Sequence, residues 1–159
     1  MFIGIDEGVD DQNNDPNKRL RGDLAAEALR TKMIEAGVIE EENATILSGN
    51  SVSKHDIIRA LAGFNLDDND KLILYLGGHS NGGVEIKMDE IFELDRGTSY
   101  LSDDELSRYV RQYTTDSTEK WIIADSCNSG GYWAGESDQD LSDLSNIAFI
   151  SPNLSDLAF

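Results

Sequence analysis

The sequence predicts an α/β fold: a three-layer sandwich in which a mostly parallel central sheet is flanked by helices. Short apolar runs alternate along the chain with segments that carry apolar residues at helical spacing, the pattern of strand–helix–strand units. With 159 residues, 39% of them hydrophobic and only two prolines, the chain can form a domain with a core of its own. We therefore expect residues 1–159 to form a single domain.

The chain opens with a strand, a loop and a helix. Residues 2–5 (FIGI) form the first apolar run, and the acid-rich stretch 6–17 predicts a long surface loop. Residues 23–36 keep their apolar side chains on one helical stripe, which predicts the first helix. Gly37 follows at the position where a helix C-terminus favours glycine.

A second strand and a second helix come next. Residues 44–47 form a short apolar run, which predicts the strand. Ser53 is followed three residues later by Asp56 and then by apolar residues at helical spacing. This pattern is typical of a helix N-terminus, because the serine and the acid cap each other's backbone amides.

The middle of the chain contains the longest predicted strand. Residues 71–76 (KLILYL) form a continuous apolar run, typical of a strand that is buried on both faces. The glycine-rich loop 77–83 and a hairpin at 84–94 follow it. Ser102 and Glu105 then form a full capping-box pattern, which predicts the start of a third helix.

Two further strands are predicted in the last third of the chain. Residues 121–124 (WIIA) form a second continuous apolar run, which also predicts a strand buried on both faces. After a polar loop at 134–146, residues 147–150 predict a fifth strand.

Charge and composition exclude several classes of partner. Thirteen Lys and Arg residues against 31 Asp and Glu residues give a net charge of −18, which repels phosphate backbones and anionic lipids. We therefore expect neither nucleic acid nor membrane as a partner, and no apolar run approaches the ~20 residues that span a bilayer. One cysteine and the lack of a secretory signal pattern predict a cytoplasmic protein.

Two reactive side chains follow the two predicted buried strands. His79 and Cys127 each lie three residues beyond one of these strands. If these two strands are neighbours in the sheet, their carboxyl ends share one edge and the two side chains face one crevice. A histidine can activate a thiol as a nucleophile, and the amide of Cys127 with that of Gly78 or Ser80 could stabilise an oxyanion.

His79 and Cys127 could instead have a purely structural role without any catalytic function. A single cysteine is often a small buried apolar group, and a loop histidine often only makes hydrogen bonds. However, Cys127 follows Asp125 and Ser126 and precedes further polar residues, where an inert core thiol is not expected. The two placements together favour a catalytic dyad.

The residues around this pair resemble a known family. Residues 75–80 (YLGGHS) and 125–130 (DSCNSG) resemble the histidine and cysteine motifs of caspase-like cysteine peptidases, in the same order along the chain. Weaker similarity extends over nearly the whole sequence, and the DSCNSG motif is its most specific part. The resemblance implies a caspase–haemoglobinase fold, in which Cys127 attacks a peptide carbonyl and His79 protonates the leaving amine.

Among these peptidases the chain looks most like prokaryotic metacaspase-like members. In them an aspartate two residues before the cysteine helps to bind arginine or lysine at the cleavage position, and here that residue is Asp125. Asp6, after the first strand, is a second candidate for the same pocket. The resemblance thus implies a cysteine endopeptidase that cleaves proteins or peptides after Arg or Lys and needs no cofactor for its chemistry.

The resemblance also implies that calcium activates the protein. Many metacaspase-like enzymes require it, and residues 85–105 carry eight acidic side chains, including Asp89, Asp103 and Asp104. Such oxygen ligands suit Ca²⁺. The alternative is that Asp103 and Asp104 only provide the negative charge that a helix N-terminus favours.

The sequence also departs from the family pattern. Ser80 stands where the family usually has glycine, and Asn128 stands where metacaspases often have histidine. Family domains have a sixth strand that carries part of the substrate pocket, and we expect this domain to lack it. A C-terminal small-subunit-like piece or a regulatory protein is therefore an expected partner.

These departures leave alternative functions open. A peptidase with a preference for acidic residues is one, because Arg19 or Arg21 lies near the position of an aspartate-selecting arginine in caspases. A catalytically inactive caspase-like interaction module is another. A phospho-acceptor receiver domain is less favoured, because it needs a lysine after the fifth strand and none follows Ile150.

Overall fold

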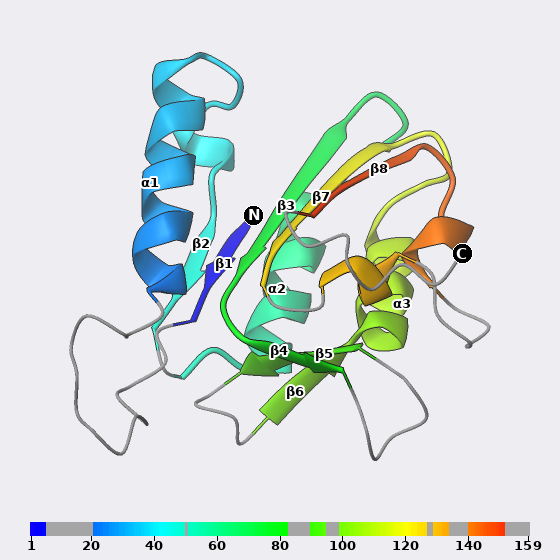
Figure 1. Ribbon diagram of the computed structural model, residues 1–159. Coiled ribbons are helices and arrows are strands. Elements are labelled where there is room, and N and C mark those ends of the chain that lie inside the picture. Colours follow the sequence, from blue (N-terminus) through cyan, green and yellow to red (C-terminus); the bar gives the residue numbers. More distant parts are fainter. Residues whose placement is uncertain are drawn as a thin grey trace.

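The computed structural model describes residues 1–5, 21–49, 51–82, 90–94, 99–126, 129–133 and 140–151. These residues form an α/β structure with a five-stranded parallel sheet (Figure 1). The strand order is β2-β1-β3-β7-β8, and each neighbouring pair is parallel. The strands are β1 (Phe2–Gly4), β2 (Ile46–Ser48), β3 (Lys71–Gly77), β7 (Glu119–Asp125) and β8 (Ile147–Ile150). All five predicted strands are confirmed, with ends that differ by at most two residues.

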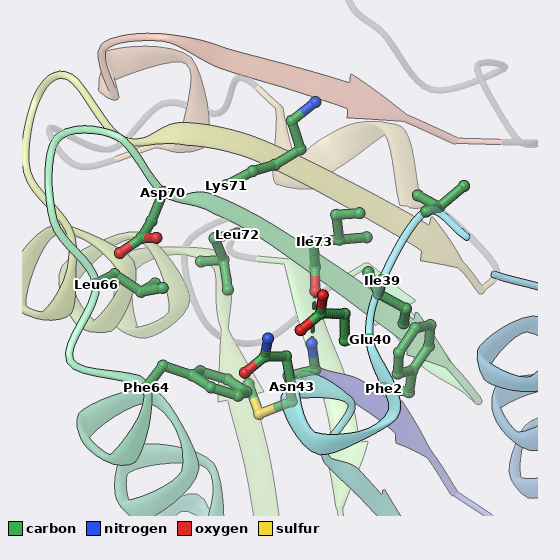
Figure 2. A pocket seen from close by; sticks show the side chains of 12 residues that line it. Phe2, Ile39, Glu40, Asn43, Phe64, Leu66, Asp70, Lys71, Leu72 and Ile73 are labelled. Carbon is green, nitrogen blue, oxygen red and sulfur yellow. Dashed lines mark hydrogen bonds between the residues drawn. The ribbon is translucent and has the colours of Figure 1, made fainter. Parts of the chain in front are cut away.

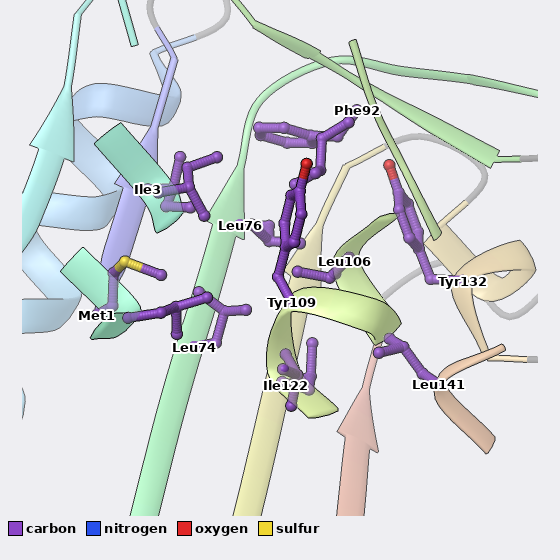
Figure 3. Packing of buried hydrophobic residues seen from close by; sticks show 14 of the residues in the cluster. Met1, Ile3, Leu74, Leu76, Phe92, Leu106, Tyr109, Ile122, Tyr132 and Leu141 are labelled. Atoms are coloured by element: carbon purple, nitrogen blue, oxygen red, sulfur yellow. The ribbon is translucent and has the colours of Figure 1, made fainter. Parts of the chain in front are cut away.

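The described α-helices cover both faces of this sheet. Helix α1 (Gly22–Glu35) packs on one face, where Ala26 joins a cluster of buried residues with Phe2 and Tyr75. Helices α2 (Lys54–Phe64) and α3 (Asp103–Tyr113) pack on the other face, against a larger cluster (Figures 1 and 3). This arrangement is compatible with the predicted three-layer sandwich.

The predicted helix ends are confirmed in atomic detail. Ser53 and Asp56 form a reciprocal capping box at the start of α2, and Ser102 and Glu105 form another at the start of α3. Each box satisfies backbone amides that have no partner within the helix. Gly37, after α1, has a φ of 67°, a left-handed conformation that glycine adopts without steric cost.

A second, antiparallel sheet lies beside the carboxyl end of β3 (Figure 1). It contains β4 (Ser80–Gly82), β5 (Glu90–Leu94) and β6 (Ser99–Ser102), in that order. The predicted hairpin is therefore correct only in part, because the partner of β5 begins within the stretch predicted as a glycine-rich loop. Residues 83–89 lie outside the described part of the chain. The apolar side chains that bury this sheet come from far apart in the sequence, so the local pattern did not reveal it.

The prediction that residues 121–124 are buried on both faces is wrong. Ile122 and Ala124 are fully buried on the α3 side, but Trp121 is 37% exposed on the opposite side. Helix α1 packs mainly over β1, β2 and β3, and Ile123 is the residue of β7 that packs against the cluster beneath it (Figure 1). A continuous apolar run therefore marks a strand in this chain, but it does not show how many layers cover that strand.

Short helical turns complete the described structure. The 3₁₀ helices are η2 (Glu41–Asn43), η4 (Ser129–Tyr132) and η5 (Leu141–Asp143). Tyr132 and Leu141, from the last two, are fully buried beside α3 (Figure 3). No α-helix in the described part of the chain is long and apolar enough to cross a bilayer.

Candidate active site

The carboxyl ends of β3 and β7 lie side by side at the centre of the candidate site. The two strands are parallel neighbours, and Gly77 at the end of β3 is paired with Asp125 at the end of β7. His79 therefore follows its strand by two residues, and Cys127 follows the neighbouring strand by two residues. The two strands are thus neighbours, which is the arrangement that the predicted dyad requires, whereas Cys127 itself lies outside the described residues.

Two hydrogen bonds join the segments that carry these residues. The Gly78 amide donates to the Asp125 carbonyl at 3.3 Å. The Ser80 hydroxyl donates to the Ser126 hydroxyl at 3.1 Å, and both serines are buried. The residues on either side of His79 are therefore held against the two residues that precede Cys127 in the sequence.

The small sheet fixes the backbone of His79. The Glu93 amide donates to the His79 carbonyl at 2.9 Å, while Ser80 is paired with Phe92. This combination makes Ser80 and Phe92 a non-hydrogen-bonded pair of the antiparallel ladder, so the Ser80 amide is directed away from β5. Gly78 leaves room for Phe92, because a Cβ on Gly78 would lie 2.9 Å from the phenyl ring. The His79 residue is partly exposed.

Tyr75 reaches across from β3 to Asp125 on β7. Its hydroxyl donates to Asp125 Oδ2 at 2.9 Å; Tyr75 is buried, and Asp125 is exposed. Burial, and to a smaller extent the hydrogen bond and the charge of Asp125, raise the pKa of the Tyr75 hydroxyl. The sequence interpretation missed Tyr75, because its nearness to Asp125 depends on the pairing of Gly77 with Asp125, which strand order and register decide.

The N-terminus of α1 packs directly against the end of β3. A Cβ on Gly22 would lie 2.2 Å from the Gly77 carbonyl oxygen, so this approach requires glycine. Arg21, just before the helix, donates to both carboxylate oxygens of Asp23, at 3.0 and 3.1 Å. Asp6 and Arg19, two other residues singled out in the sequence, lie outside the described residues.

The segment after Cys127 is anchored to the end of β8. The hydroxyl groups of Ser129 and Ser151 are 2.5 Å apart, and Ser129 is fully buried. Ser151 directly follows β8, the neighbour of β7 in the sheet. Hydrogen bonds thus hold the chain both immediately before and shortly after Cys127.

The predicted calcium ligands are only partly described. Asp103, at the start of α3, is buried, and one of its carboxylate oxygens accepts a hydrogen bond from the Asp104 amide at 2.9 Å. This contact matches the helix N-terminal role of these acids. Asp89 lies outside the described residues, and those that are described contain no group of three or more His, Cys, Asp or Glu side chains placed to hold a metal. Calcium binding therefore stays a prediction.

A cavity of about 310 Å³ lies at the opposite end of the sheet. Apolar residues such as Phe2, Phe64 and Leu66 line it, together with Glu40 (Figure 2). The Met1 amino group donates to the Ile73 carbonyl at 2.6 Å beside it, and burial lowers the pKa of this amine to about 5. The cavity is at the amino ends of β1 and β3, so it is not part of the site around His79.

No protein-family model matches the chain, and no curated protein matches it either. The resemblance to caspase-like peptidases therefore depends on the motifs around His79 and Cys127. The structure adds that these motifs follow neighbouring parallel strands.

Proposed function

We propose that this protein is a cysteine endopeptidase with a caspase–haemoglobinase fold and a dyad of Cys127 and His79. The pairing of Gly77 with Asp125 carries the proposal, because it brings the two strand ends that precede the dyad together. The hydrogen bond between Ser80 and Ser126 supports it, since these serines directly adjoin the two reactive residues. Neither link would be expected if the two motifs belonged to separate surfaces.

The proposed reaction has two steps. The Cys127 thiol transfers its proton to His79, and the thiolate forms a bond to the carbonyl carbon of the substrate. His79 then protonates the amine as the C–N bond breaks, which leaves a thioester on Cys127. In the second step His79 takes a proton from water, and the hydroxide forms a bond to the thioester carbonyl carbon. The C–S bond then breaks, the carboxylic acid product leaves, and His79 returns its proton to the Cys127 sulfur.

The oxyanion of each step needs hydrogen-bond donors from the backbone. The Gly78 amide donates to the Asp125 carbonyl, and the Ser80 amide is directed away from β5. The amide of Gly78 or that of Ser80 is the proposed donor beside the Cys127 amide. Loss of one such donor typically costs about 3 kcal/mol of transition-state stabilisation. A serine in place of the usual glycine leaves this amide in place.

Asp125 is the proposed recognition site for arginine or lysine at the cleavage position. Its carboxylate is exposed, precedes the nucleophile by two residues, and belongs to a chain with a net charge of −18 that attracts cations. The alternative with acidic specificity finds less support, because Asp23 engages the Arg21 guanidinium at two points. Asp6 would assist Asp125.

The other parts of the proposal follow from the sequence. Calcium, bound by Asp89, Asp103 and Asp104, would act as an activator and takes no part in the bond chemistry. The substrates would be proteins or peptides, and a small-subunit-like piece or a regulatory protein would be a further partner. The single cysteine favours a reducing compartment such as the cytoplasm.

Purified protein should be tested on fluorogenic peptides that end in Arg, Lys, Asp or Asn, with and without calcium. We expect cleavage after Arg and Lys, and a loss of at least about 1000-fold in kcat/KM in both Cys127→Ala and His79→Ala. His55→Ala is the matched control, because His55 is exposed on α2 and should not affect the rate. Cleavage only after Asp would contradict the proposed specificity, and no cleavage at all would favour the interaction module.

A further inference from the structure

We infer that Tyr75 is a positioning residue that fixes the plane of the Asp125 carboxylate, so that the site prefers arginine to lysine. The inference rests on one part of the proposed function, namely that Asp125 binds the basic side chain of the substrate. The inference assigns a role to Tyr75, which does not itself touch the substrate. It also predicts that the site distinguishes arginine from lysine, although both side chains carry one positive charge.

The first support is the immobility of the donor. Tyr75 is 4% exposed and belongs to the buried cluster between α1 and the sheet, with Phe2, Ala26 and Ala44. A ring packed in this way has little freedom to turn, because protein interiors are densely filled. The hydroxyl therefore has a fixed position, 2.9 Å from Asp125 Oδ2.

The second support is the space that Gly77 provides. A Cβ on Gly77 would lie 2.6 Å from the Tyr75 hydroxyl oxygen and 2.7 Å from the ring. The ring thus lies over the glycine, which is itself paired with Asp125. Tyr75 can reach the neighbouring strand only because the residue between them has no side chain.

The third support is the exposed position of the acceptor. Asp125 is exposed, although its partner is buried. A carboxylate has about four lone-pair positions, and Tyr75 uses one on Oδ2, so the remaining positions are available to a ligand. One edge of the carboxylate is therefore held by the protein while another faces a substrate.

These features affect arginine and lysine differently. A guanidinium is a planar fork that binds a carboxylate through two parallel hydrogen bonds, so it requires the two planes to match. An ammonium is a compact charge that can approach a carboxylate from many directions. Fixing the carboxylate plane therefore favours arginine more than lysine.

The test compares Tyr75→Phe with the wild type on two peptides that differ only in Arg or Lys at the cleavage position. We expect KM to rise roughly tenfold for the Arg peptide and roughly threefold for the Lys peptide, with kcat within about twofold. The Arg/Lys ratio of kcat/KM then falls about threefold. Tyr113→Phe is the matched control, because within the described part of the chain its hydroxyl accepts just one exposed hydrogen bond, from Gln112.

Asp125→Glu provides a second variant that keeps the charge. It changes an exposed residue and moves the carboxylate away from Tyr75, so it should also lower the Arg/Lys ratio. A general loss of folding would reduce kcat for both peptides and leave their ratio unchanged. An unchanged ratio in folded Tyr75→Phe and Asp125→Glu proteins would overturn the inference.

Binding measurements separate this inference from the peptidase proposal. NMR titrations with Nα-acetyl-arginine amide and Nα-acetyl-lysine amide can be made on the Cys127→Ala protein, with and without Tyr75→Phe. Tighter binding of the arginine compound, reduced by Tyr75→Phe, would support the inference even if the wild type cleaved no peptide. Absence of binding, or equal binding of both compounds before and after the substitution, would overturn it.

Discussion

The two ends of the β3 and β7 pair use their polar groups in opposite ways. At the amino end Lys120 is 2% exposed, and its ammonium donates to the carbonyls of Thr115, Thr118 and Ser145 at 2.8, 2.8 and 3.0 Å. At the carboxyl end His79 is partly exposed and Asp125 is exposed. The comparison teaches that one pair of strands can have a closed end, which holds the fold together, and an open end, whose exposed polar side chains the proposed function assigns to substrate binding and catalysis.

The closed end ties two loops to one side chain, because Thr115 and Thr118 lie before β7 and Ser145 lies before β8. Thr118 donates to the Asp67 carbonyl at 2.9 Å, so the segment before β7 is also fixed to the turn before β3. Burial lowers the pKa of Lys120, because a buried ammonium is poorly solvated. The three carbonyl partners offset that loss of solvation, and they leave this ammonium no donor for a ligand.

The largest effect is expected at the closed end. Lys120→Met keeps the length of the side chain but leaves three carbonyls without their donor, so we expect the free energy of unfolding to fall by about 4 kcal/mol. Lys71→Met is the control, because the Lys71 ion pair with Glu119 is exposed at 3.1 Å and should contribute less than about 1 kcal/mol. Urea unfolding measures both, and equal losses would contradict the distinction between buried and exposed ammonium groups.

The next effect concerns the packing of α1 against the open end. Gly22→Ala places a methyl group against the Gly77 carbonyl, so we expect a loss of about 3 kcal/mol. Gly63→Ala should have the opposite sign and stabilise the protein by about 0.5 kcal/mol, because no atom lies within 4 Å of the added Cβ and Gly63 is within α2. Thermal unfolding of the two variants provides the comparison. A stable Gly22→Ala protein would show that the helix does not approach the strand this closely.

A smaller effect is expected from the serine link between the two strand ends. Ser80→Ala and Ser126→Ala should each cost about 1 kcal/mol of stability and lower kcat several-fold, since each removes the same buried hydrogen bond. The double variant should lose little more than either single variant, which a double-mutant cycle can measure. Ser142→Ala, on an exposed turn, is the control. Additive losses would show that the two hydroxyl groups act independently.

The smallest effect is a pH dependence at the start of α2. The Ser53 hydroxyl, followed by the Ser53 amide, lowers the pKa of Asp56 below its ordinary 3.8. Because this pKa is lower in the folded chain, the ionised carboxylate contributes stability above the unfolded value, and the contribution is lost as pH falls through the folded value. The difference in the free energy of unfolding between the wild type and Asp56→Asn should therefore become smaller as the pH is lowered.

Chemical unfolding at pH 7 and at pH 3 can measure this narrowing. Asp143→Asn is the control, because it removes an exposed carboxylate that makes no side-chain hydrogen bond within the described residues. A difference that stays constant over this range would show that the capping box does not depend on the charge of Asp56.

Local patterns predicted much of the secondary structure. The capping boxes at Ser53 and Ser102 were readable because their partners lie three residues away, within one helical turn. The positions of His79 and Cys127 after two apolar strands could also be predicted, because each residue lies only a few positions beyond its apolar run. Strands β4 and β6 were missed because their pairing depends on contacts with β5, and the short sequences themselves show no strand pattern.

The sequence by itself determined the α/β class, the set of five sheet strands and the positions of the two proposed reactive residues in the chain. Only the tertiary structure decided that β3 and β7 are neighbours, that Tyr75 reaches Asp125 over Gly77, and that Trp121 is left partly uncovered. The physical reason is the range of the interactions. Strand and helix signals come from residues a few positions apart, whereas the site depends on strand order, register and close packing between segments about 50 residues apart.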